Sequence, residues 1–184
     1  MRYPLVRKLL PVAALVAAVA GCSVSLPGRD VTMNEAMSLF NEACLEDLPD
    51  FREFGTSPSF GSLELVSNER GTSYQLPDAN LILTNVDMGE LAPEVPAFVI
   101  CGVSFAASDA GTSQIGNSFL STATRATGGP PQDNITKGSR VYTYHLRNGS
   151  VLNYDTGRRG DTTLHTVWIS NPQSREDINF LEGL

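Results

Sequence analysis

Residues 97–107 read Ala-Phe-Val-Ile-Cys-Gly-Val-Ser-Phe-Ala-Ala, and this nearly continuous run of apolar and β-branched residues decides the fold. Such a run is typical of a strand that lies at the centre of a sheet and is buried on both faces. Because every second side chain of a strand points to the same face, one face carries Val99, Cys101, Val103 and Phe105. We therefore expect a central strand here, with a cysteine on the face that receives the next layer.

The stretch before this strand predicts a helix that can pack on that face. The sequence Thr32-Met33-Asn34-Glu35 fits a capping box, in which Thr32 accepts from the amide of Glu35 and the Glu35 side chain reaches back to the amide of Thr32. The apolar positions that follow form one stripe at helical spacing, Met33, Met37, Phe40 and Cys44. Pro49 is expected to end the helix.

The segments between this helix and the central strand carry shorter signals. Residues 51–54 are expected to form a helical turn, and residues 62–66 and 72–76 to alternate as two strands around a turn. Residues 80–86 form another apolar run. Residues 88–96 contain two prolines and are expected to form a loop.

The second half of the chain predicts another helix followed by strands. The helical stripe contains Ile115, Phe119, Leu120, Ala123 and Ala126. We expect it to begin at Thr112 or Ser113 and to end at Gly128-Gly129, since glycine readily takes the left-handed conformation that follows a helix. Strands are expected at residues 140–146, 150–154 and 162–170, and a last short helix at residues 174–181.

The first two of these strands are expected to form a hairpin whose register depends on the loop. A two-residue turn of Asn148 and Gly149 would place the tyrosines of one strand and the apolar residues of the next on opposite faces of the sheet. A three-residue loop with Gly149 in the left-handed conformation instead pairs Tyr144 with Leu152 and Tyr142 with Tyr154. We predict the three-residue loop, because it collects the large side chains on one face.

Together these elements predict an α+β fold. Two helices pack on one face of a mainly antiparallel sheet, which ends in a C-terminal three-stranded meander. Residues 31–184 are long enough for one domain with a real core, and we expect a single globular domain.

The first residues of the chain predict export. Arg2, Arg7 and Lys8 form a positive region, residues 9–20 a short apolar region, and Ala20-Gly21 the small residues of a cleavage site. The apolar run is shorter than the roughly 20 residues that a helix needs to cross a bilayer. Residues 1–21 are therefore expected to be a signal peptide.

The end of this signal, Val19-Ala20-Gly21-Cys22, resembles the lipobox of bacterial lipoproteins. The resemblance implies that the thiol of Cys22 receives a diacylglyceryl group and that the chain is cut before Cys22. Cys22 then begins the mature chain, and its new amino terminus is acylated as well. In Gram-negative lipoproteins an aspartate after the cysteine favours retention in the inner membrane, so that Ser23 implies the outer membrane. Two or three acyl chains anchor a protein stably. Residues 22–30 are then a lipidated tether, and the domain lies in the cell envelope, on the periplasmic side.

Two cysteines remain once Cys22 is assigned to lipid. In an oxidising compartment an even pair is expected to form a disulfide, here Cys44–Cys101, and two buried free thiols are the alternative. Residues 36–44, with Pro49 and Phe51, also resemble the start of small exported bacterial proteins of unknown function. Those proteins carry a Phe-x-x-x-Cys helix and a second cysteine in a later apolar strand, and no function transfers from them.

The charge of the mature chain restricts its partners. Residues 22–184 carry 10 basic and 20 acidic side chains, a net charge of −10, and the excess acid lies in residues 22–100. Such a surface repels nucleic acid and anionic lipid. We expect no nucleic-acid partner.

No motif in the sequence predicts catalysis, a cofactor or a metal. His145 and His165 are the only histidines, and with Asp155 they could form a polar patch on the outer face of the predicted hairpin. A metal or acid–base site needs a further ligand or a nucleophile, and no metalloprotease, Cys-x-x-Cys or Gly-x-Ser-x-Gly motif is present. We expect both histidines to be exposed on strands, with no catalytic, cofactor-binding or metal-binding residue.

Two functions follow from these observations. The favoured one is a lipid-anchored, non-enzymatic binding or structural module at the outer membrane, whose partner is an envelope protein or a wall component. The alternative is a surface-tethered hydrolase that uses an unrecognised site near His145, Asp155 and His165.

Overall fold

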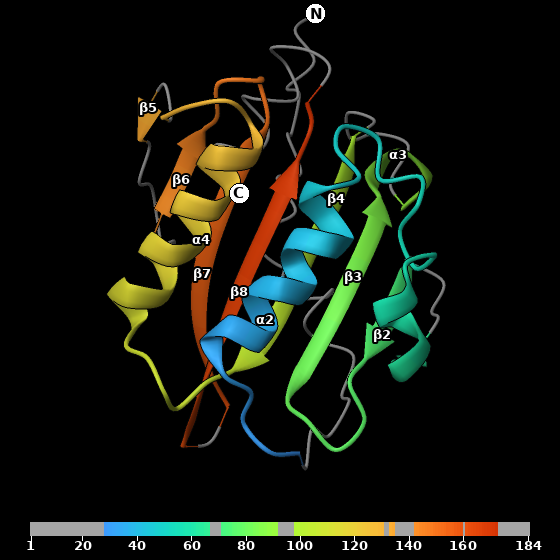
Figure 1. Ribbon diagram of the computed structural model, residues 1–184, viewed down its shortest axis with the longest axis vertical. Helices are drawn as coiled ribbons and strands as arrows, with labels where there is room; N and C mark the ends of the chain where they lie inside the picture. The colour runs from blue at the N-terminus through green and yellow to red at the C-terminus, as the bar shows by residue number, and fades with distance from the viewer. Residues whose placement is uncertain are drawn as a thin grey trace, which may run out of the picture.

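Eight strands form one antiparallel sheet in the order β1-β2-β3-β4-β8-β7-β6-β5 (Figure 1). This computed structural model describes residues 28–66, 71–91, 98–130, 133–134, 142–159 and 161–172. The number of strands is that of the described residues. The strands are β1 (Glu64–Leu65), β2 (Thr72–Gln75), β3 (Leu81–Asp87), β4 (Val99–Ala106), β5 (Asp133–Asn134), β6 (Tyr142–His145), β7 (Val151–Arg159) and β8 (Thr162–Ser170). The α+β class predicted from the sequence is confirmed.

The central strand lies within the apolar run at residues 97–107, as predicted. It is β4, which pairs with β3 on one side and β8 on the other. Cys101 and Phe105 have no exposed surface, and both point to the helix-covered face of the sheet. Gly102 points to the other face, where an added Cβ would lie 2.7 Å from the Cβ of Trp168.

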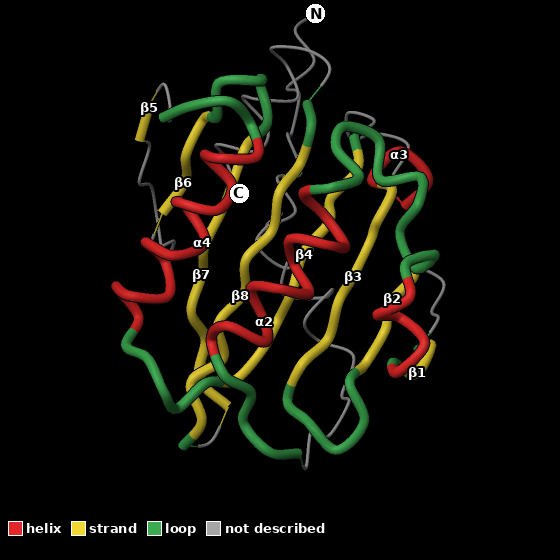
Figure 2. Tube along the Cα trace, viewed as in Figure 1, coloured by secondary structure: helices red, strands yellow, loops and turns green. Residues whose placement is uncertain are grey.

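Helices α2 (Met33–Phe40) and α4 (Thr112–Ala126) lie side by side over one face of the sheet (Figures 1 and 2). Aromatic rings join them to the central strand. The ring centroids of Phe40 and Phe119 are 5.3 Å apart, and those of Phe119 and Phe105 are 5.7 Å apart. Because these rings are almost completely buried, they anchor both helices to the sheet.

The start of α2 follows the predicted cap only in part. The hydroxyl of Thr32 accepts a hydrogen bond of 3.1 Å from the amide of Glu35, as predicted. The Glu35 carboxylate, however, pairs with the guanidinium of Arg29 at 2.7 Å and does not reach back to Thr32. The carboxylate of Asp109 accepts from the amide of Met33 and so satisfies another free donor at this helix end.

The end of α2 lies earlier than predicted. Its hydrogen-bond ladder changes at Asn41 into a π-helical turn, Asn41–Leu45, which contains Cys44. A π turn inserts one extra residue and rotates the side chains that follow. Turns occupy residues 46–50, so the helical geometry is lost before Pro49.

Several local predictions need correction. Residues 52–56 form turns after Phe51, which has a positive φ of 53°, and not the predicted helical turn. Residues 88–91 form a one-turn helix, α3 (Met88–Leu91), where we predicted a loop. Residues 58–62 form an unpredicted 3-10 helix, Pro58–Ser62. The cap of α4 is the backbone of Gly111, and neither Thr112 nor Ser113 caps it.

The hairpin between β6 and β7 has the predicted register. Tyr142 pairs with Tyr154, and Tyr144 with Leu152. The amide of Leu146 donates to the carbonyl of Ser150 at 2.8 Å, and Gly149 has a φ of 91°. The three-residue loop with a left-handed glycine is therefore confirmed.

The two ends of the sheet differ in what lies there. The proximal end, at the bottom of Figure 1, is where β3 and β8 begin and where β4 and β7 end. The distal end is the opposite one, where β3 and β8 end and β4 begins. The predicted signal peptide, Cys22, most of the predicted tether and the helix predicted at residues 174–181 lie outside the described residues.

Candidate functional site

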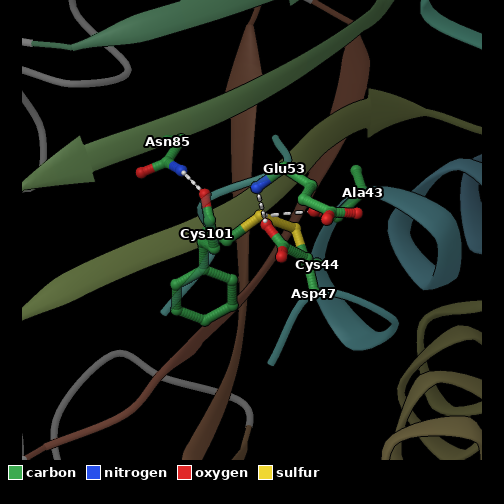
Figure 3. The surroundings of a disulfide bond; sticks show 7 residues. Ala43, Cys44, Asp47, Glu53, Asn85 and Cys101 are labelled. Atoms are coloured by element: carbon green, nitrogen blue, oxygen red, sulfur yellow. Dashed lines mark hydrogen bonds between the residues drawn. A yellow bond between two sulfur atoms is a disulfide. The ribbon is translucent and has the colours of Figure 1, made fainter. Parts of the chain in front are cut away.

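A disulfide between Cys44 and Cys101 joins the helix layer to the central strand (Figure 3). The two cysteines were predicted to pair, and their Cα atoms are 5.5 Å apart. Neither has exposed surface, and the sulfur of Cys101 lies 3.5 Å from the carbonyl oxygen of Ala43. Because both sulfurs are buried in an apolar core, this disulfide is a structural cross-link.

The chain that follows Cys44 is held against the distal end of the sheet. The carboxylate of Asp47 accepts a 2.6 Å hydrogen bond from the amide of Glu53, which closes the loop on itself (Figure 3). The side-chain amide of Asn85, on β3, donates to the carbonyl of Phe51 at 3.3 Å. The disulfide and these two contacts fix the position of Pro49, Asp50 and Arg52.

A cleft of about 370 Å³ opens between this loop and the distal strand ends. We call it the distal cleft, and its lining is Pro49, Asp50, Arg52, Asp87, Phe98, Val99 and Asn171. The Arg52 guanidinium pairs with the Asp50 carboxylate at 2.7 Å, and both side chains are largely exposed. On the other wall the Asp87 carboxylate accepts from the amide of Gly89 at 2.9 Å.

The chemistry of the distal cleft suits binding. Its lining combines two carboxylates, one guanidinium and one amide with the apolar surfaces of a proline, a valine and a phenylalanine. Such a mixture provides both hydrogen-bond donors and hydrogen-bond acceptors beside apolar surface. No serine, cysteine, histidine or lysine is among the described residues that line it.

His165 is buried within the core and is not on the outer face. It is 2% exposed, and its Nδ1 lies 2.8 Å from the hydroxyl of Tyr154. The same hydroxyl donates its hydrogen to the carbonyl of Thr112, the first residue of α4, at 3.2 Å. Burial lowers the pKa of His165 and raises the pKa of Tyr154 to about 12. Both groups are therefore neutral at pH 7.

The structure does not bring the predicted polar patch together. His145 and Asp155 alternate with Tyr144 and Tyr154 along β6 and β7, so they point to the face opposite to the helices. His165 contacts the rings of Phe105 and Tyr154 on the helix side. The sheet separates the two histidines. The expectation that both are exposed is thus wrong. The strand register places His165 beside the core aromatics, and His145 is half-buried on the other face.

The described residues offer no other obvious centre for chemistry. Among them, no group of three histidine, cysteine, aspartate or glutamate side chains is placed to hold a metal ion. In the same part of the chain, no helix is both long and apolar enough to cross a bilayer. Cys22, the predicted lipid attachment, is outside it.

Sequence reasoning missed the distal cleft. Its lining comes from three separate places: the loop after the disulfide, the facing ends of β3 and β4, and the residue after β8. No local pattern links these positions. The signal that could have pointed to it was the predicted disulfide, which draws the loop after Cys44 towards the start of the central strand.

Comparison with known proteins identifies no relative. The chain matches no protein-family model, and neither the curated proteins nor the solved structures contain a match to it.

Proposed function

We propose that the mature chain is a lipoprotein of the cell envelope, anchored at the outer membrane through Cys22. In this proposal it is a non-enzymatic binding or structural module, and its partner is an envelope protein or a wall component. The lipobox carries the anchor, and the distal cleft is the contact surface for the partner.

One observation supports the anchored module above all. The chain is fixed to the fold from Gly28 onward, six positions after Cys22. The amide of Arg29 donates to the carbonyl of Asp78 at 2.8 Å, and the amide of Val31 to the carbonyl of Ala106 at 2.9 Å. A domain that begins so soon after the modified cysteine is held close to its membrane.

Gly28 is suited to this position. The side-chain amide of Asn80 donates to the carbonyl of Gly28 at 2.7 Å, and an added Cβ would lie 2.6 Å from the backbone of Ala79. Only a residue without a Cβ allows the chain to approach the sheet so closely. Gly28, where the tether meets the domain, is therefore closely packed against the backbone of Ala79.

The anchor is tested by metabolic labelling with radioactive palmitate in a Gram-negative host. The native chain should incorporate label and fractionate with the outer membrane, whereas Cys22→Ala should do neither. Ser23→Asp, which keeps the cysteine, should still be labelled but move to the inner membrane. Label retained in Cys22→Ala would exclude this attachment.

The binding role is tested by crosslinking in intact cells, followed by capture from detergent extract. Arg52→Glu replaces a positive charge in the distal cleft by a negative one and should abolish capture of the partner. Arg125→Glu makes the same charge change at an exposed position of α4 that does not line the distal cleft, and serves as the matched control. No captured partner for the native chain, or equal loss in both variants, would count against a binding role for the cleft.

A further inference from the structure

We infer that the proximal end of the sheet faces the bilayer and contacts zwitterionic phospholipid headgroups, so that the distal cleft is presented away from the membrane. The inference rests on the proposed lipid attachment at Cys22. It adds an orientation and a second interaction surface, neither of which the lipobox predicts.

The position of the tether supports the orientation. Residues 28–31 cross the proximal end, where Arg29 bridges to Ala79 just before β3 and Val31 bridges to Ala107 just after β4 (Figure 1). Six residues, 22–27, reach at most about 20 Å when extended. The proximal end is therefore always within about that distance of the lipid.

The length of the sheet places the distal end much farther away. Strand β8 has nine residues and runs from the proximal to the distal end. At about 3.4 Å per residue, the two ends are separated by about 27 Å. A tether fixed at the proximal end therefore allows the distal cleft to lie well outside the headgroup layer.

The β7–β8 hairpin extends the proximal end towards the lipid. Ala106, the last residue of β4, is level with Leu164 of β8, and two further pairs, Arg158 with Thr163 and Arg159 with Thr162, continue beyond it. Two pairs add about 7 Å. The hairpin is thus the part of β7 and β8 that reaches the headgroups first.

The charges of the proximal end fit a zwitterionic surface. Arg158 is exposed, and among the described residues it has no carboxylate within ion-pair distance. Its guanidinium can bind a lipid phosphate through two parallel hydrogen bonds. Asp30, Asp78 and Asp161 are exposed at the same end, and each can attract the ammonium group of phosphatidylethanolamine. An anionic headgroup would satisfy Arg158 but would repel the three carboxylates.

The orientation is tested with the full lipidated chain in vesicles of phosphatidylcholine and phosphatidylethanolamine that contain a headgroup-linked quencher. Thr162→Cys places a fluorescent label at the proximal end, and Arg147→Cys places one in the β6–β7 turn at the distal end. Each new cysteine is the only free thiol, because Cys22 is acylated and Cys44 is paired with Cys101. We expect several-fold more quenching of the label at position 162.

Two further measurements test the headgroup contact. Arg158→Glu should lower the quenching at position 162 several-fold, whereas Arg125→Glu, on α4, should leave it unchanged. Replacing phosphatidylethanolamine by phosphatidylglycerol should also lower it, because the exposed aspartates are then repelled. Stronger quenching in phosphatidylglycerol would overturn the assignment to a zwitterionic surface.

Flotation of the vesicles separates the two proposals. Protein that floats, but whose two labels are quenched equally or whose distal label is quenched more, would overturn the orientation and leave the anchor intact. Protein that does not float, as expected for the Cys22→Ala control, would overturn the anchor itself and the orientation with it.

Discussion

The burial of His165 beside Tyr154 should make the stability of the fold sensitive to mild acid. Burial lowers the pKa of His165 from its ordinary value of 6.5. The unfolded chain therefore binds a proton at this side chain at a higher pH than the folded chain does. Stability from the neutral imidazole is complete above about pH 6.5 and is lost as the pH falls from there towards the folded-state pKa.

The size of the effect follows from the linkage between protonation and folding. Over that interval the free energy of unfolding should fall, with a limiting slope of about 1.4 kcal/mol for each pH unit. The aromatic side chains of Phe105 and Tyr154 contact the ring, and neither is an anion that could stabilise an imidazolium. A folded-state charge at this site would also disturb the contact of Tyr154 with the start of α4.

The assay is urea unfolding between about pH 7 and about pH 5, compared between the native chain and His165→Phe. Carboxylates titrate in both proteins, so the difference between their unfolding free energies isolates the histidine. We expect this difference to fall as the pH is lowered, by at most about 1.4 kcal/mol per unit. If His165→Phe folds poorly, His165→Gln gives the same comparison.

A difference that stays constant over this pH range would refute the reasoning, because it would mean that His165 has the same proton affinity in both states. Nuclear magnetic resonance titration of the His165 ring in the folded chain provides a direct check. Its midpoint should lie below that of a histidine in an unstructured peptide.

Three other perturbations test the rest of the core. Cys44→Ser with Cys101→Ser opens a loop of 57 residues, and in the chain-entropy model this should lower the unfolding free energy by about 4 kcal/mol, as measured by urea unfolding. Reduction of the native chain should reproduce that loss. Gly102→Ala forces a Cβ against the neighbouring strand and should cost about 1–3 kcal/mol, whereas Gly61→Ala, which meets open space, should lower the thermal midpoint little. At alkaline pH, Tyr154 ionises at about pH 10 when unfolded and about pH 12 when folded, so stability should fall by about 2–3 kcal/mol between these values. Tyr154→Phe should abolish that decline, and a decline that persists would show that another group causes it.

The accuracy of the sequence-based predictions depended on how local their causes were. The strand around Cys101, the Thr32 cap and the left-handed Gly149 were predicted, because each is set by neighbouring residues and by backbone geometry. The predicted partner of the Glu35 side chain, the amide of Thr32, was wrong. Arg29 lies within reach of Glu35 only because the chain before α2 is held at the proximal end of the sheet. The outer-face position of His165 was wrong for a related reason, since the alternating pattern of β8 alone did not identify which face meets the helices.

The sequence by itself determined the α+β class, the central strand and the cysteine pair. The periodicity of apolar residues and the even number of remaining cysteines can both be read from the order of residues without knowledge of their packing. The proposed lipid attachment rests on the sequence alone, on Val19-Ala20-Gly21-Cys22. Only the tertiary structure decided that His145 and His165 lie on opposite faces, that a cleft forms beside the disulfide loop, and that residues 28–31 join the opposite end of the sheet. The physical reason is that these features depend on strand order and register, which are set by packing between residues far apart in the chain.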